Sequence, residues 1–86
     1  MRQGQAGTLE SNDAVITVAE APAGSGIIID IESSVKAAYG DAIEAVIRDA
    51  CREAGIVDAE VDVRDKGALD CTIRARTLTA ITRAGL

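Results

Sequence analysis

Two short stretches in the first half of the chain have the apolar pattern of strands. Residues 14–19 are rich in β-branched side chains, which favour a strand. In residues 27–32, isoleucine recurs at every second position, so Ile27, Ile29 and Ile31 share one face. The opposite face carries Ile28, Asp30 and Glu32. One buried and one solvated face favours an antiparallel or mixed sheet that is covered on one side.

A turn precedes the first of these strands. The triplet Ser11-Asn12-Asp13 favours a turn because its side chains can bond nearby backbone groups. We expect residues 7–10 to form a short strand that pairs with residues 14–19 in a hairpin. Residues 1–6 are expected to be a loose tail, which leaves residues 7–86 as a single domain.

The central part of the chain has apolar residues at helical spacing after Ser33 and Ser34, either of which can cap a helix. Gly40 interrupts the pattern and costs about 1 kcal/mol relative to alanine. We therefore expect a helical turn at 34–39 and a main helix at 41–54. The apolar positions are Val35, Tyr39, Ala42, Ile43, Val46, Ile47 and Ala50.

Residue types at both ends of the main helix support these bounds. Asp41 followed by Glu44 resembles a capping box, in which a polar side chain at the start and a glutamate three residues later satisfy free N–H groups. Gly55 is placed to end the helix in the left-handed backbone conformation.

The last third of the chain predicts a strand followed by a helix. Residues 57–64 alternate, and one face is formed by Ala59, Val61 and Val63. The turn Asp65-Lys66-Gly67 separates this strand from a helix over residues 68–84, whose apolar stripe contains Leu69, Ile73, Ala80 and Ile81. Arg74, Arg76 and Arg83 suit the negative C-terminal end of that helix.

The predicted order of elements is β-β-β-α-β-α. Strands with one solvated face need a layer of helices on the other face to bury their apolar side chains. The sequence therefore predicts an α+β fold, a two-layer sandwich in which two helices cover one face of a small, mostly antiparallel sheet. The chain has 86 residues with no tryptophan, no phenylalanine and one tyrosine, so its core must be aliphatic.

Charge and composition exclude several classes of protein. The net charge of −5 argues against nucleic-acid binding, which needs a basic surface. The acidity either keeps a small domain soluble or allows docking on a basic partner. No apolar stretch approaches the roughly 20 residues of a membrane span, and residues 1–7 lack the apolar core of a signal peptide. With two cysteines, too few for a disulfide framework, we expect a cytoplasmic protein with reduced thiols.

Residues for catalysis are scarce. The chain has no histidine, which removes Ser-His and Cys-His pairs and most zinc sites, and we expect no bound metal. Cys51 and Cys71 lie in different predicted helices without a CxxC motif, and we expect each to be a buried structural cysteine. Gly24-Ser25-Gly26 lacks the third glycine of a nucleotide-binding loop. These features point away from an enzyme.

Two motifs, however, resemble those of one family. Gly7-Thr8-Leu9-Glu10-Ser11-Asn12-Asp13 resembles the modification motif of citrate lyase acyl carrier proteins, the gamma subunits, and Asp65-Lys66-Gly67-Ala68-Leu69-Asp70-Cys71 resembles a second motif of that family. Ser33-Ser34-Val35 and Tyr39-Gly40-Asp41-Ala42-Ile43 match it in order and spacing. The resemblance extends from about Gly7 to Arg83.

The resemblance implies that Ser11 carries 2'-(5''-phosphoribosyl)-3'-dephospho-CoA through a phosphodiester, attached by a dedicated transferase. The thiol of this arm would hold acetyl and citryl groups as thioesters during citrate fermentation. The alpha subunit of citrate lyase would exchange acetyl for citryl, and the beta subunit would cleave the citryl thioester with a divalent metal held outside this chain. Glu10 and Asp13, which flank Ser11, would orient the hairpin on basic subunit surfaces.

Other interpretations remain open. The acyl carriers of malonate decarboxylase and of citramalate lyase would bear the same type of arm. An unmodified protein-interaction module would leave Ser11 as an ordinary turn serine. A small enzyme would use Cys51 or Cys71 as a reactive thiol. We interpret Asp65-Lys66-Gly67 as a plain turn in preference to a docking site, and Asp70 as a helix-start residue.

Overall fold

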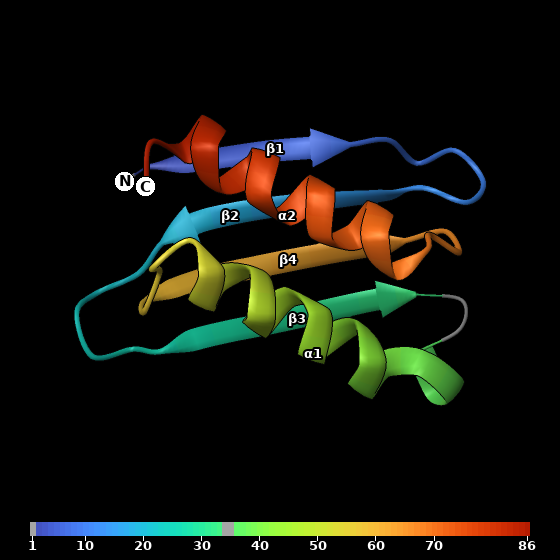
Figure 1. The fold of residues 1–86 in the computed structure, drawn as a ribbon, viewed down its shortest axis with the longest axis horizontal. Helices are drawn as coiled ribbons and strands as arrows, with labels where there is room; N and C mark the ends of the chain where they lie inside the picture. The colour runs from blue at the N-terminus through green and yellow to red at the C-terminus, as the bar shows by residue number, and fades with distance from the viewer. Residues whose placement is uncertain (1, 34–35) are drawn as a thin grey trace.

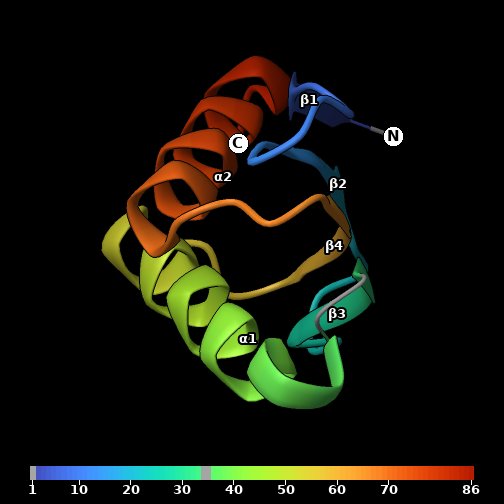
Figure 2. The same ribbon diagram turned by 90° about the vertical axis from the view of Figure 1, so that its right-hand side faces the viewer.

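The computed structural model describes residues 2–33 and 36–86, which fold as two layers. The elements are β1 (Gln3–Gly7), β2 (Ala14–Glu20), β3 (Ile27–Ser33), α1 (Lys36–Glu53), β4 (Ala59–Asp65) and α2 (Asp70–Ala84). The strands form one sheet in the order β1-β2-β4-β3, and both helices cover the same face of it (Figures 1 and 2). The predicted α+β sandwich and its order of elements are confirmed.

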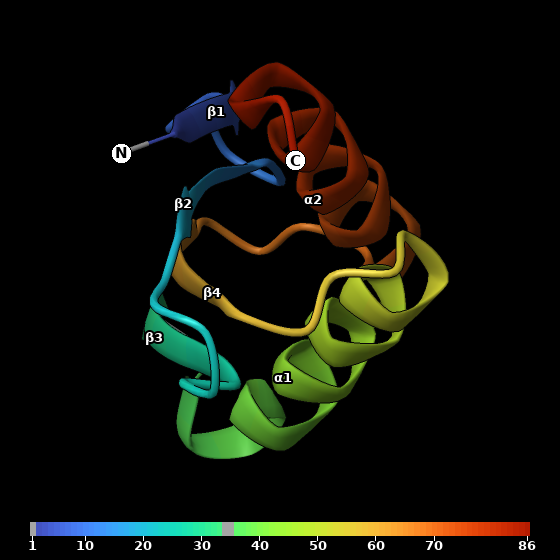
Figure 3. The same ribbon diagram turned by 90° about the vertical axis from the view of Figure 1, so that its left-hand side faces the viewer.

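The sheet is mixed but mostly antiparallel, as predicted. β2 pairs antiparallel with both β1 and β4. β3 pairs parallel with β4, because α1 carries the chain back along the sheet between the two strands. The view from the opposite side shows the same two layers, with α1 lying over β3 and β4 and α2 over β1 and β2 (Figure 3).

An aliphatic core fills the space between the layers. The alternation of β4 is confirmed, with Ala59, Val61 and Val63 buried and the residues between them exposed. Ile47 of α1 and Ile73 of α2 are fully buried against this face. β3 is an edge strand, so its inward isoleucines are only partly buried while they pack on the core; they are Ile27, Ile29 and Ile31.

Helix α1 is longer than expected. It begins at Lys36 and runs through Gly40, so the predicted break and the capping box at Asp41 are wrong. The cost of one glycine, about 1 kcal/mol, is small beside the burial of one apolar face, which supplies most helical stability in proteins. The predicted helical positions Ser34 and Val35 lie outside the described residues.

The predicted end of α1 is confirmed. Gly55 has a φ of 74° and donates its N–H to the carbonyl of Arg52, while Ile56 donates to the carbonyl of Cys51. This pair of hydrogen bonds is a Schellman motif, which satisfies carbonyls at a helix end and needs a left-handed residue such as glycine.

Helix α2 begins at Asp70, two residues later than expected, and the helix-start role of Asp70 is confirmed. The prediction that Leu69 belongs to the buried stripe is wrong, since that side chain is 69% exposed. Leu69 precedes the first helical turn, and the inward-facing stripe begins one turn later. The buried residues of α2 are Ile73, Thr77, Ala80, Ile81 and Ala84.

The N-terminal residues are ordered in the sheet, so the expected loose tail over 1–6 is wrong for residues 3–6. β1 pairs with β2 from Gln3↔Ala19 to Gly7↔Val15. Gly4 allows this, because a Cβ there would collide with the α2 backbone at Ala80, Arg83 and Ala84.

The expected strand at residues 7–10 is also wrong, because β1 ends at Gly7 and residues 8–13 form the connection to β2. The predicted hairpin itself is confirmed. Its first strand lies nearer the N-terminus than expected, since the close approach of α2 fixes the position of β1 and the sequence QGQAG contains no β-branched residue.

Candidate attachment site and the surfaces beside it

Ser11 lies in the connection between β1 and β2, which we call the Ser11 loop (residues 8–13). Figure 1 shows this loop at the same end of the molecule as the segment between β4 and α2 and the N-terminal ends of both helices. Ser11 is exposed, and its side chain makes no hydrogen bond to any residue in the described ranges. The placement of Ser11 in an exposed turn agrees with the sequence analysis.

Hydrogen bonds within the Ser11 loop fix its shape on both sides of the serine. The Thr8 hydroxyl donates to Asp13 Oδ2 at 2.8 Å and accepts the Glu10 N–H at 3.2 Å. Asp13 N–H donates to the Glu10 carbonyl at 3.2 Å. Asn12 has a φ of 65°, a conformation that asparagine adopts more readily than most residues. These hydrogen bonds join the residues before Ser11 to Asp13 after it, so the backbone on both sides of the serine is held in place.

The Ser11 loop is also tied to the end of β4, so the two sequence motifs meet in space. Asn12 N–H donates to the Lys66 carbonyl at 2.8 Å, and Lys66 N–H donates to the Asp13 carbonyl at 2.9 Å. These bonds continue the antiparallel ladder beyond the pair Ala14↔Asp65. The segment Asp65-Lys66-Gly67 is thus more than the plain turn that we expected, because it supports the loop that carries Ser11.

Asp13 anchors the Ser11 loop to α2 through an ion pair. The Arg76 guanidinium donates to Asp13 Oδ1 at 3.1 Å and to Oδ2 at 2.9 Å, and Ala14 N–H donates to Oδ1 at 2.7 Å. The hydrogen bonds from Arg76, followed by those from Ala14 and Thr8, hold the pKa of Asp13 well below its usual range. The same contact raises the pKa of Arg76. Asp13 is therefore ionised and paired at neutral pH.

This ion pair bears on two expectations. The side chain of Asp13 is only 14% exposed and its charge is compensated, whereas Glu10 is exposed. Of the two acids expected to orient the hairpin on a partner, Glu10 is the one that a partner can reach. Arg76 and Arg74 do not serve the C-terminal end of α2 as expected; Arg76 binds Asp13, and Arg74 pairs with Glu53 of α1.

An apolar groove of about 690 Å³ lies between the N-terminal parts of α1 and α2. Tyr39 is 59% exposed and Leu69 is 69% exposed at its rim. Cys71 also lines the groove and is exposed, so the prediction of a buried cysteine is wrong there, because Cys71 lies in the first turn of α2 and outside its buried stripe. Cys51 is fully buried as predicted, and burial raises the pKa of its thiol.

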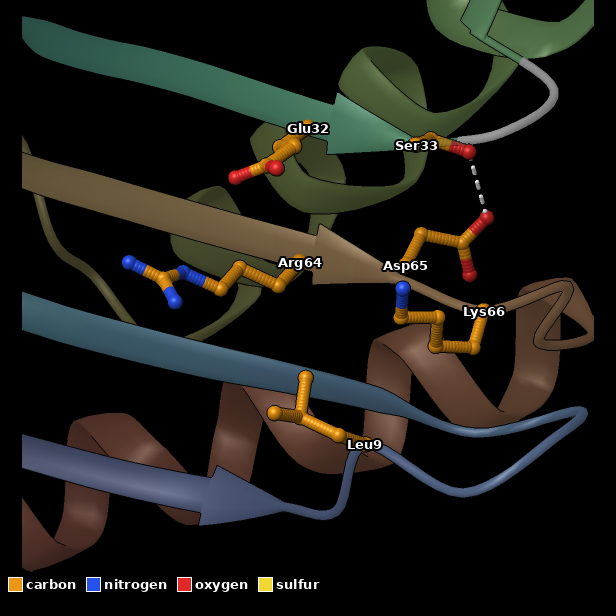
Figure 4. Close-up of a pocket in the computed structure, with 6 residues that line it drawn as sticks. All are labelled: Leu9, Glu32, Ser33, Arg64, Asp65 and Lys66. Atoms are coloured by element: carbon orange, nitrogen blue, oxygen red, sulfur yellow. Dashed lines mark hydrogen bonds between the residues drawn. The ribbon is translucent and has the colours of Figure 1, made fainter.

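A second, more polar pocket of about 370 Å³ lies beside the Ser11 loop; its lining residues are Leu9, Glu32, Ser33, Arg64, Asp65 and Lys66. Figure 4 shows Arg64 and Lys66 on one side of Leu9 and Glu32 beyond Arg64. Asp65 is 2% exposed, and its carboxylate accepts the Ser33 hydroxyl at 2.9 Å and the Ala68 N–H at 2.9 Å. Asp65 thereby joins the ends of β3 and β4 to the start of α2.

Residues 2–33 and 36–86 contain neither a metal-binding cluster nor a helix that could cross a membrane. No group of three or more cysteine, aspartate or glutamate side chains in these residues is arranged to hold a metal ion. Within the same ranges, neither helix has the length and apolar character that crossing a membrane requires.

Comparison with known proteins identifies the family. The family model described as malonate decarboxylase delta subunit (MdcD) matches residues 1–84. The citrate lyase acyl carrier protein of Lactobacillus helveticus is 52% identical over 92% of this chain and 79% of its own length. That of Streptococcus uberis is 49% identical over 98% of this chain and 81% of its own length.

The fold is also found among solved structures. A chain in the crystal structure of a Pseudomonas malonate decarboxylase hetero-tetramer in complex with malonate superimposes with a TM-score of 0.80, covering 98% of this chain and 84% of that chain, at 16% identity. Together with the identities of about half over most of the chain, the matching family model shows that this chain belongs to the family of citrate lyase acyl carrier proteins.

Proposed function

We propose that this acyl carrier protein serves citrate lyase by holding acetyl and citryl groups on a phosphoribosyl-dephospho-CoA arm that is joined to Ser11. The acyl carrier role follows from the family, whose members are named carriers and not catalytic subunits. The observation that carries the choice of Ser11 is its exposed hydroxyl, free of partners among the described residues, on a loop that is hydrogen-bonded on both sides.

The residues around Ser11 fit a covalent group of this kind. Its hydroxyl can be reached by a transferase without opening any internal contact of the described chain. When bound, the arm supplies a thiol on which acyl groups are held as thioesters. The anchors on either side of Ser11 keep the point of attachment in place, so the arm's own length sets the volume that it sweeps.

The chain leaves activation of the serine to its transferase. A serine hydroxyl is a weak nucleophile unless a base accepts its proton. The chain has no histidine, and Asp13 is held ionised by Arg76 as an ion-pair partner. A carboxylate whose pKa is lowered in this way is a poor proton acceptor. We propose that the transferase provides the base and that this chain provides only the exposed hydroxyl.

The proposed partners are the alpha and beta subunits of citrate lyase and the prosthetic-group transferase, all in the cytoplasm. Glu10 is exposed next to Ser11 and would face a basic surface around the entrance to each active site. Asp13 contributes by holding the loop, since its own charge is paired. No metal is assigned to this chain.

The test is an intact-mass measurement after incubation with the cognate transferase and triphosphoribosyl-dephospho-CoA. We expect the wild type to gain one phosphoribosyl-dephospho-CoA and Ser11→Ala to gain none. Ser25→Ala is the matched control, because Ser25 is also an exposed loop serine, and it should load like the wild type. Loading of Ser11→Ala, or failure of the wild type beside a carrier that loads, would overturn the assignment.

A second candidate is the acyl carrier of malonate decarboxylase. The family model and the TM-score of 0.80 favour it, although the 16% identity supports the fold alone. Incubation of the loaded carrier with each enzyme's subunits separates these candidates and citramalate lyase, because only the cognate subunits will exchange the acyl group. A chain that no transferase loads would be an unmodified interaction module.

A further inference from the structure

The pocket on the sheet face that the helices leave open adjoins the Ser11 loop, and its place in the fold is determined by hydrogen bonds. Leu9 belongs to the loop and lies two residues before Ser11. The backbone of Lys66 bonds to Asn12 and Asp13, the two residues after Ser11. Figure 4 shows Lys66 and Arg64 on the same side of Leu9, with the Lys66 ammonium group turned toward β4 and the Arg64 guanidinium extending along that strand. A group attached to Ser11 therefore begins next to this pocket.

The pocket contains one cation without an ion pair among the described residues and a second cation with only a weak one. Lys66 is exposed and forms no ion pair with any described residue. Arg64 has one ionic contact, with Asp62 at 3.8 Å, and both side chains are more than half exposed, at 58% and 51%. Such a long, exposed pair contributes little and is readily exchanged for a better acceptor.

Two acidic side chains, Asp65 and Glu32, also line the pocket. Asp65 accepts hydrogen bonds from Ser33 and Ala68, so it does not compete for Lys66 or Arg64. Glu32 is the remaining carboxylate, and Figure 4 places it beyond Arg64 as seen from Leu9. The side of the pocket nearest the Ser11 loop is thus formed by a cation and an apolar side chain.

We propose that Lys66 and Arg64 bind phosphate groups of the arm on Ser11, and that Leu9 packs against the uncharged part next to them. This inference rests on the proposed function, because it assumes that the arm is attached to Ser11. Its phosphodiester and diphosphate are anionic at neutral pH, and lysine and arginine are the side chains that recognise such groups. On a chain with a net charge of −5, binding these phosphates also compensates their repulsion.

The consequence is a division of the arm into a held part and a free part. The phosphates next to Ser11 would lie on the open face of the sheet, on the side away from the groove between the helices. Only the remainder, which ends in the thiol, would then move between active sites. Fewer freely rotating bonds would reduce the conformational entropy that is lost when the thiol enters an active site.

The experiment compares the loaded carrier with variants of the pocket by phosphorus NMR. Wild type, Lys66→Ala, Arg64→Ala and the control Arg52→Ala are loaded, and single loading is confirmed by intact mass. We expect at least one phosphorus resonance of the native wild type to differ from that of the same loaded protein unfolded in urea, and we expect this difference to shrink in Lys66→Ala and Arg64→Ala. Arg52→Ala, at the other end of the molecule, should give the wild-type spectrum.

A second measurement uses only the wild-type protein, so it tests the inference even if the variants load poorly. Backbone amide spectra of the unloaded and loaded protein should differ at Leu9, Arg64 and Lys66 as well as at Ser11. Identical phosphorus spectra in all variants, or amide changes confined to residues 10–12, would overturn the inference and leave the attachment at Ser11 intact. Failure of the wild type to gain mass would instead overturn the proposed function, and this inference with it.

Discussion

The Ser11 loop and the loop over residues 21–26 lie at opposite ends of the molecule, and each is held by an aspartate (Figure 1). Asp58 accepts the N–H groups of Gly24 and Gly26 at 3.1 and 2.8 Å, which are backbone contacts only. Asp13 binds Arg76 on α2 in addition to groups of its own loop. Both loops also expose a serine, Ser25 in one and Ser11 in the other.

The comparison teaches that an ordered loop with an exposed serine does not by itself define a site. What distinguishes the Ser11 end is the ion pair that connects its loop to α2, together with Lys66, an exposed cation that forms no ion pair among the described residues. Matched substitutions at the two ends of the molecule should therefore have unequal effects.

The largest effect is expected from Gly4→Ala in β1, the strand that leads into the Ser11 loop. Gly4→Ala places a Cβ against the α2 backbone, which should lower the free energy of unfolding by about 2–3 kcal/mol, as overpacking of a core does. Gly24→Ala is the control, because open space surrounds it and only its φ of 90° opposes a side chain, at a cost of about 1–2 kcal/mol. Urea denaturation measures both, and equal losses would show that α2 does not fix β1.

The next effect concerns the two aspartates. Asp13→Asn should lower the unfolding temperature at pH 7 by more than Asp58→Asn does, because it removes a charged, two-bond contact with α2 and leaves Arg76 without its partner. Thermal denaturation of both variants decides the order. A larger loss in Asp58→Asn would mean that the ion pair is not the stronger anchor.

The ion pair also sets a pH dependence. The folded-state pKa of Asp13 lies below its ordinary value of 3.8, so its stabilisation is complete above that value and is lost as the pH falls toward the folded-state pKa. The stability difference between wild type and Asp13→Asn should be constant from pH 7 to about pH 5 and shrink below about pH 4. A difference that stays unchanged down to pH 3 would contradict this origin.

The two thiols should report the same contrast between the ends. Cys71 is exposed at the Ser11 end, whereas Cys51 is buried near the end of α1 that faces the other loop. A chromogenic disulfide reagent should therefore titrate one thiol quickly in the native protein and the second only after unfolding. Fast reaction of both thiols, or of neither, would show that the groove or the core is different from the one described.

The smallest effect is expected from surface charge. Glu10→Lys should slow association of the loaded carrier with the lyase subunits by several-fold at low salt, and less at high salt, because steering by an exposed charge is screened. Glu60→Lys reverses an exposed acid in β4 at the other end and should change the rate little. Equal effects of the two variants would assign the steering to net charge alone.

Periodicity was sufficient to predict the parts of the fold that local residue pattern determines. The alternation of β4 and the isoleucines of β3 gave the correct faces, and Gly55 gave the correct helix end. Periodicity failed where contacts distant in sequence decide the structure. β1 has almost no strand propensity of its own and is held by α2. Helix α1 crosses Gly40 because the burial of Ile43 and Ile47 further along the helix outweighs the cost of one glycine.

The candidate site divides in the same way. The exposure of Ser11 could be predicted from its turn-forming neighbours. The partners of the loop could not, because Arg76 and Lys66 come from the last third of the chain and no local pattern connects them with Asp13 or Asn12. The exposure of Cys71 followed from where α2 begins, and helix boundaries are the least predictable feature of a sequence.

The central claim is that one hydroxyl, that of Ser11, carries the arm. The most direct test is to load the wild-type protein, digest it and locate the added mass by fragmentation of the peptides. We expect the mass on Ser11 alone, with Thr8 in the same loop and Ser25 in the opposite loop unmodified. Modification at Thr8 or Ser25, or a distribution over several hydroxyls, would contradict the account.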